Sequence, residues 1–266
     1  MLNAKNCRVQ ISTGGMDYIR FGYGPRIMVM LPGVGDGLKT VKGMAVPFAL
    51  MYRKLVKDFT VYVFSRRVGL ATGMTTRDMA SDLSEAMDVL GLSNAAVVGV
   101  SQGGMIAEWL AIDHPDKVGK LVLTVTLARP NDVIRDVVGR WLGMADNGDY
   151  KGIMVDTAER AYSPKKLKRE KLMYSILGSF GKPKSFERFR IQAESCMTHD
   201  AYEELPKIEC PVLVIGGTDD KIVTGRASVE IAEKIPGSML HIYEGLGHGL
   251  YEEAPDFLRR VAVFCM

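Results

Sequence analysis

Short, mostly apolar runs alternate along the chain with segments in which apolar residues recur every three or four positions. Such runs occur at Ile27–Leu31, Val61–Phe64, Ala95–Val100, Leu121–Val125 and Val212–Ile215. Strands that are apolar at every position, rather than at alternate positions, predict a sheet buried on both faces. Because helical segments separate them, the strands should pair in parallel through right-handed crossovers. The pattern therefore predicts an α/β fold with a mostly parallel central sheet flanked by helices.

The first segments of the chain predict an antiparallel edge to this sheet. Val9–Ser12 and Tyr18–Phe21 lie on either side of the glycine pair at positions 14 and 15. This arrangement is typical of a hairpin. Further along, Thr75 and Asp78 have the spacing of a capping box in front of a helical segment.

A long segment between the fourth and fifth apolar runs keeps the helical periodicity but contains no strand-like run. It predicts an all-helical insertion. We therefore expect residues 1–126 to form the first part of the core, 127–205 the helical insertion and 206–266 the second part of the core.

Composition narrows the classes of function. The 266 residues include 34 basic and 31 acidic ones, so the net charge of +3 offers no strong field for nucleic acid or a membrane surface. The first residues lack the apolar core of a signal peptide, and no run approaches the ~18 apolar residues of a membrane span. The four cysteines stand far apart without a CxxC pair and should be reduced thiols. We expect a cytoplasmic protein without a metal or cofactor.

One serine has the setting of a nucleophile. The segment Gly99-Val100-Ser101-Gln102-Gly103 fits the pattern Gly-x-Ser-x-Gly and lies between an apolar run and a helical segment. At such a junction a nucleophile can be held on a sharp, strained turn. The flanking glycines lack the Cβ atoms that would collide as the chain doubles back. The alternative is a glycine-rich turn whose serine only caps the helix.

A serine hydroxyl becomes a good nucleophile when a neighbouring base accepts its proton, and the chain has four histidines. His114 lies at a helix end, where capping is expected, and His199 lies in the helical insertion, where a surface position is expected. His241 lies within a strand. His248 follows that strand on a glycine-rich loop, a kind of segment that often carries function. We predict that His248 is the base.

The imidazole of the base needs a carboxylate that fixes its tautomer and stabilises the imidazolium. Asp219 and Asp220 follow the run Val212–Ile215 at the carboxyl end of a strand, where open parallel sheets place ligand sites. Ser101 and His248 follow strands in the same way. The three groups should therefore meet at one edge of the sheet.

Acyl transfer also needs backbone donors for the developing oxyanion. The run Ile27–Leu31 ends in a glycine-rich loop, so the N–H groups of Val34 and of Gln102 are expected to converge beside Ser101. A phosphate-binding loop is a poor alternative, because the glycines lack Gly-x-Gly-x-x-Gly spacing and no Gly-Lys-Ser/Thr follows.

Together these motifs resemble the α/β-hydrolase superfamily, in which the triad occurs in the order Ser, Asp, His. The matching motifs are Leu31-Pro-Gly, Gly-Val-Ser-Gln-Gly-Gly, His-Pro-Asp-Lys-Val, Pro-Val-Leu-Val-Ile-Gly-Gly-Thr-Asp-Asp and Gly-His-Gly. The resemblance covers nearly the whole core. It implies a triad of Ser101, Asp220 and His248, because the family places its acid three residues after a glycine, here Gly217.

The resemblance further implies that the helical insertion is a cap over the active site, so apolar cap residues such as Trp141 and Phe189 should control selectivity. Two departures from the family pattern stand out. Pro32 replaces a histidine that is common before the oxyanion glycine, and Ser65 replaces an aspartate in the loop after the second run. The first leaves the backbone donor intact. The second means that the family's ion pairing around Arg67 cannot be carried over.

The leading interpretation is a serine hydrolase that cleaves a carboxylic ester or lactone of a small organic substrate through an acyl-serine intermediate. Carbon–carbon bond hydrolysis, cofactor-free perhydrolysis and acyl transfer use the same triad in the family and stay open. A ligand-binding protein without turnover is a further alternative. A broken triad would favour this last interpretation, whereas here all three residues are present.

Overall fold

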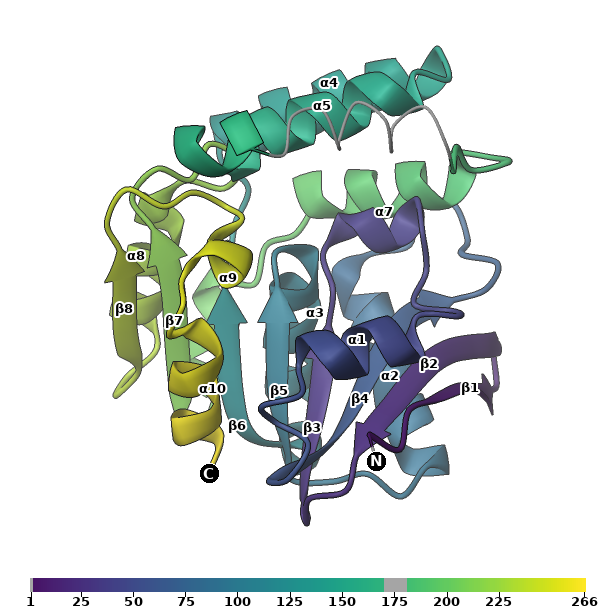
Figure 1. Ribbon diagram of the computed structural model, residues 1–266, viewed down its shortest axis with the longest axis vertical. Coiled ribbons are helices and arrows are strands. Elements are labelled where there is room, and N and C mark those ends of the chain that lie inside the picture. The colour runs from purple at the N-terminus through teal and green to yellow at the C-terminus, as the bar shows by residue number, and fades with distance from the viewer. Residues whose placement is uncertain (1, 170–180) are drawn as a thin grey trace.

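The computed structural model describes residues 2–169 and 181–266. Its centre is an eight-stranded sheet with the strand order β1-β2-β4-β3-β5-β6-β7-β8 (Figure 1). The strands are β1 (Lys5–Ile11), β2 (Gly14–Gly22), β3 (Arg26–Leu31), β4 (Phe59–Arg67), β5 (Ala95–Val100), β6 (Val118–Thr124), β7 (Val212–Gly217) and β8 (Met239–Tyr243). β2 pairs antiparallel with β1 and β4, and the other neighbours pair in parallel. The predicted edge hairpin and the mostly parallel sheet are confirmed.

Helices cover the sheet and its carboxyl edge. They are α1 (Ala45–Met51), α2 (Thr76–Val89), α3 (Gln102–Asp113), α4 (Asp132–Asp146), α5 (Tyr150–Ala161), α7 (Glu187–Met197), α8 (Gly225–Lys234), α9 (Leu250–Glu253) and α10 (Phe257–Cys265), with the 3-10 turns η1 (Val34–Gly37), η2 (Pro115–Lys117) and η3 (Tyr202–Lys207). The capping box before α2 is confirmed. The N–H of Asp78 donates to Oγ1 of Thr75, and the N–H of Thr75 donates to Oδ2 of Asp78.

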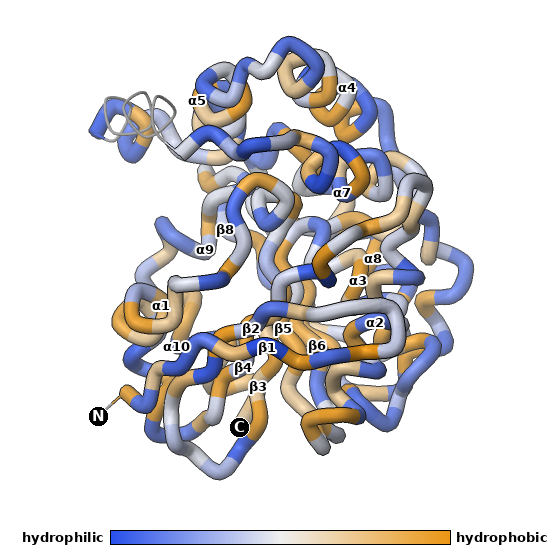
Figure 2. Tube along the Cα trace, turned by 90° about the vertical axis from the view of Figure 1, so that its right-hand side faces the viewer, coloured by the Kyte–Doolittle hydropathy of each residue, from blue (hydrophilic) through white to orange (hydrophobic). Residues whose placement is uncertain are grey.

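The sheet is buried on both faces, as the apolar runs predict. Successive residues of β5 point to opposite sides: Val97 belongs to the cluster of α2 and α3, and Val98 to the cluster of α1 and α10. Figure 1 shows α1 and α10 in front of the sheet and α2 and α3 behind it. In Figure 2 the hydrophobic residues gather in the strands between these two helical layers.

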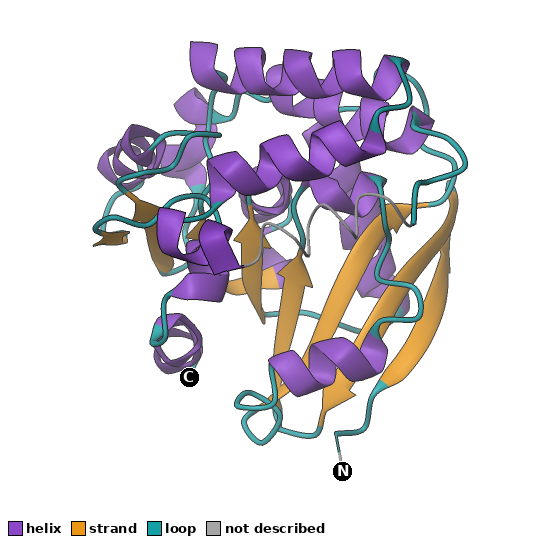
Figure 3. Ribbon diagram, turned by 45° about the horizontal axis from the view of Figure 1, so that its top comes forward, coloured by secondary structure: helices purple, strands orange, loops and turns teal. Residues whose placement is uncertain are grey.

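The described residues between β6 and β7 form helices and connecting loops without a strand, and α4, α5 and α7 lie across the carboxyl ends of the parallel strands (Figures 1 and 3). These helices have a hydrophobic cluster of their own, which includes Trp141 and Phe189 and reaches Met105 at the start of α3. Loops that leave the strands at this edge therefore end beneath the helices.

Two further findings bear on the expectations from composition. Nowhere in residues 2–169 and 181–266 is a helix both long enough and apolar enough to span a bilayer. All four cysteines are thiols, and burial raises the pKa of Cys196 and of Cys265 to about 12, in keeping with a packing role.

Candidate active site

Ser101 occupies a strained backbone position between β5 and α3. Its φ of 55° and ψ of −124° lie where residues with a Cβ atom are rarely found. Hydrogen bonds of the Ser101 backbone hold this conformation in place. The N–H of Ser101 donates to the carbonyl of Thr124 at 2.9 Å, and its carbonyl accepts from the N–H of Gly104 at 2.7 Å and from Oγ1 of Thr126 at 2.9 Å. The turn thus projects the hydroxyl out of the sheet edge, as the Gly-x-Ser-x-Gly pattern predicts.

Glycines allow the chain to approach itself at this turn. A Cβ on Gly103 would lie 2.1 Å from the carbonyl oxygen of Leu31, so α3 packs directly against the end of β3. A Cβ on Gly33 would lie 3.2 Å from Cβ of Ser101. The glycine-rich loop after β3 therefore lies against the serine, where sequence analysis expects it.

Asp220 and His248 form a hydrogen-bonded pair. Oδ2 of Asp220 lies 2.8 Å from Nδ1 of His248, and their side chains are only 1% and 9% exposed. Burial alone would raise the pKa of Asp220. The nearby His248 and the N–H groups of Ile222 and Val223, which donate to Oδ1 at 2.8 and 3.0 Å, outweigh burial and hold that pKa below its usual value. Asp220 is therefore an ionised acceptor for the imidazole.

Asp219 takes no part in this pair. Its side chain is exposed, and its Oδ1 accepts a hydrogen bond from the hydroxyl of Thr218 at 2.9 Å. Between the two adjacent carboxylates, the geometry brings Asp220 to His248.

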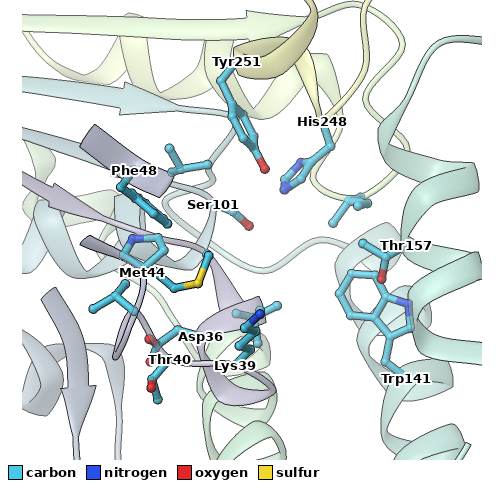
Figure 4. A pocket seen from close by; sticks show the side chains of 17 residues that line it. Asp36, Lys39, Thr40, Met44, Phe48, Ser101, Trp141, Thr157, His248 and Tyr251 are labelled. Carbon is cyan, nitrogen blue, oxygen red and sulfur yellow. The ribbon is translucent and has the colours of Figure 1, made fainter. Parts of the chain in front are cut away.

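Ser101 and His248 line one cavity of about 360 Å³, a size typical of small-molecule sites. In Figure 4 the hydroxyl of Ser101 and the imidazole of His248 point toward each other across this space. The walls also include Trp141 of α4 and Thr157 of α5. Trp141 is one of the two apolar residues of the helical segment that were expected to contact the substrate. Phe189 is different, because it is 1% exposed, packs on Gly37 and is not part of the cavity lining.

The two expected oxyanion donors occupy equivalent places in their elements. Val34 is the first residue of η1 and Gln102 the first residue of α3. The N–H groups at such positions have no partner within the helix and lie at its positive end. Val34 lines the cavity, and Gln102 directly follows Ser101.

The side chain of Gln102 is fully buried and faces away from the cavity. Its Nε2 donates to the carbonyl of Gln192 at 2.7 Å and to Oγ of Ser195 at 3.0 Å, both on α7. Its Oε1 accepts from Nη2 of Arg66 at 2.9 Å, and the same nitrogen donates to the carbonyl of Pro32 at 2.6 Å. Gln102 thus connects the serine turn, the glycine-rich loop and α7.

A buried carboxylate completes this polar network, which we call the Asp36 network. Oδ2 of Asp36 accepts from Nη2 of Arg188 at 2.6 Å, from the N–H of Arg66 at 3.2 Å and from Nε2 of Gln192 at 3.3 Å. The Asp36 side chain is 0% exposed and that of Arg188 is 21% exposed. The sequence pattern does not predict these contacts, because the partners lie far apart in the chain and no local motif marks them.

The remaining histidines lie outside the cavity. The expected surface position of His199 is wrong: this residue is 2% exposed, with Nε2 2.9 Å from Oε2 of Glu108 and Nδ1 2.8 Å from Oγ1 of Thr76. His114 ends α3 and His241 lies in β8, as expected. Within the described ranges, no group of three or more His, Cys, Asp or Glu side chains is placed to hold a metal ion.

Comparison with known proteins agrees with this architecture. Residues 27–150 match the family model described as alpha/beta hydrolase fold. The chain is 29% identical over 225 residues to a protein of Caulobacter sp. (strain K31) named as a carbamate hydrolase, RutD, covering 80% of this chain and 83% of the relative. It is 24% identical over 269 residues to 2-hydroxy-6-oxononadienedioate/2-hydroxy-6-oxononatrienedioate hydrolase 2 of Pseudomonas putida, covering 94% and 91%.

A solved structure extends the comparison to three dimensions. The enol-lactonase from Burkholderia xenovorans LB400 superposes with a TM-score of 0.81 at 21% identity, covering 97% of this chain and 99% of that one. The likeness covers the sheet and the helices across its carboxyl edge alike. The predicted fold is confirmed.

Proposed function

Because the chain belongs to the α/β-hydrolase superfamily and is a hydrolase, we propose that it cleaves a carboxylic ester or lactone of a small organic molecule through an acyl-serine intermediate on Ser101. The observation that carries the proposal is the buried Asp220–His248 pair, 2.8 Å apart, in a cavity whose wall includes Ser101. A hydroxyl, an imidazole and a carboxylate in this relation are the parts of a nucleophilic triad.

In the acylation step, Nε2 of His248 accepts the hydroxyl proton while Oγ of Ser101 bonds to the carbonyl carbon. The carbonyl electron pair moves to oxygen, and the N–H groups of Val34 and Gln102 stabilise that negative charge. When the tetrahedral intermediate collapses, the carbon–oxygen bond to the alcohol breaks and His248 returns its proton to the alkoxide. Ionised Asp220 accepts a hydrogen bond from the Nδ1–H of His248 throughout and stabilises the imidazolium.

In the second half of the reaction, water attacks the acyl-serine and releases the acid. His248 takes a proton from the water as its oxygen attacks the acyl carbon, and the same donors hold the second oxyanion. Collapse then breaks the bond to Oγ of Ser101, which regains its proton, and the carboxylic acid leaves. No metal or cofactor enters these steps.

We propose that residues 127–205 act as a cap between the core parts 1–126 and 206–266. Trp141 and Thr157 of this segment line the cavity opposite the glycine-rich loop. Side chains there would contact the groups that flank the scissile bond. As substrate we propose a small organic molecule, and as compartment the cytoplasm, where cysteines stay reduced.

The charges around the cavity favour an ester or lactone over a dianionic substrate of carbon–carbon hydrolysis. Among the described residues of the lining, Lys39 is the one lysine or arginine, and it is exposed. The guanidinium of Arg188 donates to Asp36 and to two backbone carbonyls. Nη2 of Arg66 donates to the carbonyl of Pro32 and to Oε1 of Gln102. Two carboxylates entering this space would therefore find little compensating charge.

The test is a substrate panel with wild type and Ser101→Ala. It contains p-nitrophenyl esters of graded acyl length, five- and six-membered lactones, a carbamate and the dienedioate named for the Pseudomonas putida relative. We expect turnover of esters or lactones that Ser101→Ala abolishes. Exclusive turnover of the dienedioate, or ester hydrolysis that survives Ser101→Ala, would contradict the proposal.

A further inference from the structure

A second cavity, which we call the α1/α10 cavity, lies beside the first and has a volume of about 230 Å³. It lies on the sheet face covered by α1 and α10, the helices in front of the sheet in Figure 1. Its floor is made by sheet residues, among them Met30, Val63 and Val98. Its sides are made by α1, by α9 and, through Leu258 and its neighbours, by α10.

The two cavities share part of their walls beside Ser101, which lines the first of them. Both are lined by Pro32, Gly33, Phe48, Val100 and Tyr251. Gly33 approaches Ser101 so closely that a Cβ there would lie 3.2 Å from the serine Cβ. The α1/α10 cavity therefore begins next to the proposed nucleophile.

The walls of the α1/α10 cavity are almost wholly apolar. Glu252 is the one charged residue among the described lining, and its oxygens are bound to Nζ of Lys166 at 2.7 Å and to the hydroxyl of Tyr162 at 3.0 Å. Burial raises the pKa of the lining residue Tyr52 to about 12, so its phenol is neutral at ordinary pH. A ligand group in this space gains from apolar burial and has no charge to neutralise.

The position of His248 decides which half of an ester enters. His248 lines the first cavity but not the α1/α10 cavity. Because the alcohol oxygen must reach Nε2 of His248 to receive its proton, the alcohol group belongs to the first cavity. The acyl group lies on the other side of the carbonyl carbon and faces the α1/α10 cavity.

We propose that the α1/α10 cavity is the acyl-chain site, and that the preferred substrates are esters of unbranched, medium-length fatty acids. This inference rests on the proposed function of Ser101. The cavity volume of about 230 Å³ limits the length of acyl chain that can be buried. Met51 at the outer end is 58% exposed, so the ends of longer chains reach solvent. Their reactivity should reach a plateau.

The first experiment compares two ester series: p-nitrophenyl alkanoates with acyl chains of graded length, and alkyl acetates with alcohols of the same lengths. In the first series we expect kcat/KM to rise up to about fourfold per methylene, the ratio equivalent to about 0.8 kcal/mol for a buried CH₂, and then to level off. The alkyl acetate series should show a weaker dependence. An acyl series that is flat, or that falls from acetate onward, would overturn the inference.

Variants on α10 locate the effect. Leu258→Trp fills the α1/α10 cavity and should lower the ratio of kcat/KM for the octanoate ester to kcat/KM for the acetate ester at least about tenfold. Val263→Trp on the same helix, where the native side chain is 63% exposed, is the matched control and should leave both esters unchanged. If Leu258→Trp fails to fold, Met51→Trp at the exposed mouth replaces it and should depress the longest esters only.

A binding experiment separates failure of this inference from failure of the proposed function. Methyl ketones with alkyl chains of graded length cannot be hydrolysed, and their binding to the wild-type protein is measured by calorimetry. Affinity that rises with chain length and is lost in Leu258→Trp supports the site even if no ester is turned over, an outcome that would overturn the proposed function alone. Ester turnover with ketone affinities that ignore chain length would overturn the acyl-chain site alone.

Discussion

Oδ2 of Asp220 lies 2.8 Å from Nδ1 of His248, whereas the adjacent Asp219 is exposed and bound to the hydroxyl of Thr218. Asp220→Asn keeps the shape of the acid but favours the wrong histidine tautomer. We therefore expect kcat to fall at least about a hundredfold in Asp220→Asn and less than about tenfold in Asp219→Asn. Thermal unfolding of both variants controls for stability. The reverse ranking in steady-state kinetics would move the acid to Asp219.

Covalent labelling tests Ser101 directly. A fluorophosphonate probe should label the wild-type protein on Ser101 and should not label Ser101→Ala, because no other serine within residues 2–169 and 181–266 combines a strained turn with His248. Ser81→Ala is the control and should keep full labelling, since its hydroxyl is exposed and donates to the carbonyl of Arg77 on the same helix. Mass spectrometry identifies the modified residue. Undiminished labelling of Ser101→Ala would refute the assignment.

Substitution of Trp141 should change selectivity rather than chemistry. Its side chain lines the first cavity, while its Nε1 donates to Asp156 at 2.9 Å. Trp141→Leu should alter the ranking of esters with different alcohols by about 1–3 kcal/mol in kcat/KM, with acylation of Ser101 retained. Phe189→Leu, which changes a residue outside the cavity, should lower stability but change kcat/KM by the same factor for all substrates. A uniform loss across alcohols in Trp141→Leu would exclude this role.

The Asp36 network should contribute strongly to stability. Arg188→Met removes the cation from a carboxylate that is 0% exposed, and we expect unfolding free energy to fall by about 3–5 kcal/mol. Arg190→Met on the same helix removes the cation from an exposed pair with Asp146, which should cost less than about 1 kcal/mol. Denaturant unfolding of both variants measures the difference. Equal losses of unfolding free energy in the two variants would mean that leaving buried Asp36 without its cation costs no more than breaking an exposed ion pair.

The buried pair of Glu108 and His199 predicts a pH dependence of stability. Burial raises the pKa of Glu108 above its ordinary value of 4.5, against the opposing effect of His199. The contribution of this carboxyl to the free energy of unfolding is therefore fully present below about pH 4.5, and it is lost as the pH rises through the raised pKa of the folded protein. Relative to wild type, Glu108→Gln should gain stability as the pH rises.

Urea unfolding at intervals from about pH 4 to about pH 8 measures this trend. The control is Glu233→Gln, in which the native carboxylate is exposed and paired with Arg226, and its difference from wild type should stay nearly constant. A constant difference for Glu108→Gln as well would show that the carboxyl titrates alike in the folded and unfolded protein.

Local patterns predicted much of the fold because they report local requirements. The run Ala95–Val100 is apolar at every position because Val97 and Val98 face different helical layers, and that run is β5. Thr75 and Asp78 satisfy each other within one turn, so their spacing alone marks the start of α2. Such features need no knowledge of the rest of the chain.

The site was predictable where a residue follows a strand, and was missed where a contact crosses the chain. Ser101, Asp220 and His248 each stand after a strand, so parallel pairing alone brings them to one edge. The pairing of Asp36 with Arg188 depends on where α7 lies over the core, and hydropathy does not encode that position. His199 was misplaced for the same reason, because its partner Glu108 lies on α3.

The contacts of Gln102 with α7 limit which helices of this protein can be replaced by those of a relative. The glutamine that follows the serine is held by Gln192 and Ser195 of α7, while Arg188 of that helix holds the loop that carries Val34. A chimera that imports the helices between β6 and β7 from another hydrolase would therefore inherit a misaligned pair of backbone donors unless these α7 side chains travel with the graft. In this chain, α7, the loop that carries Val34 and the start of α3 that carries Gln102 can be exchanged for those of a relative only together.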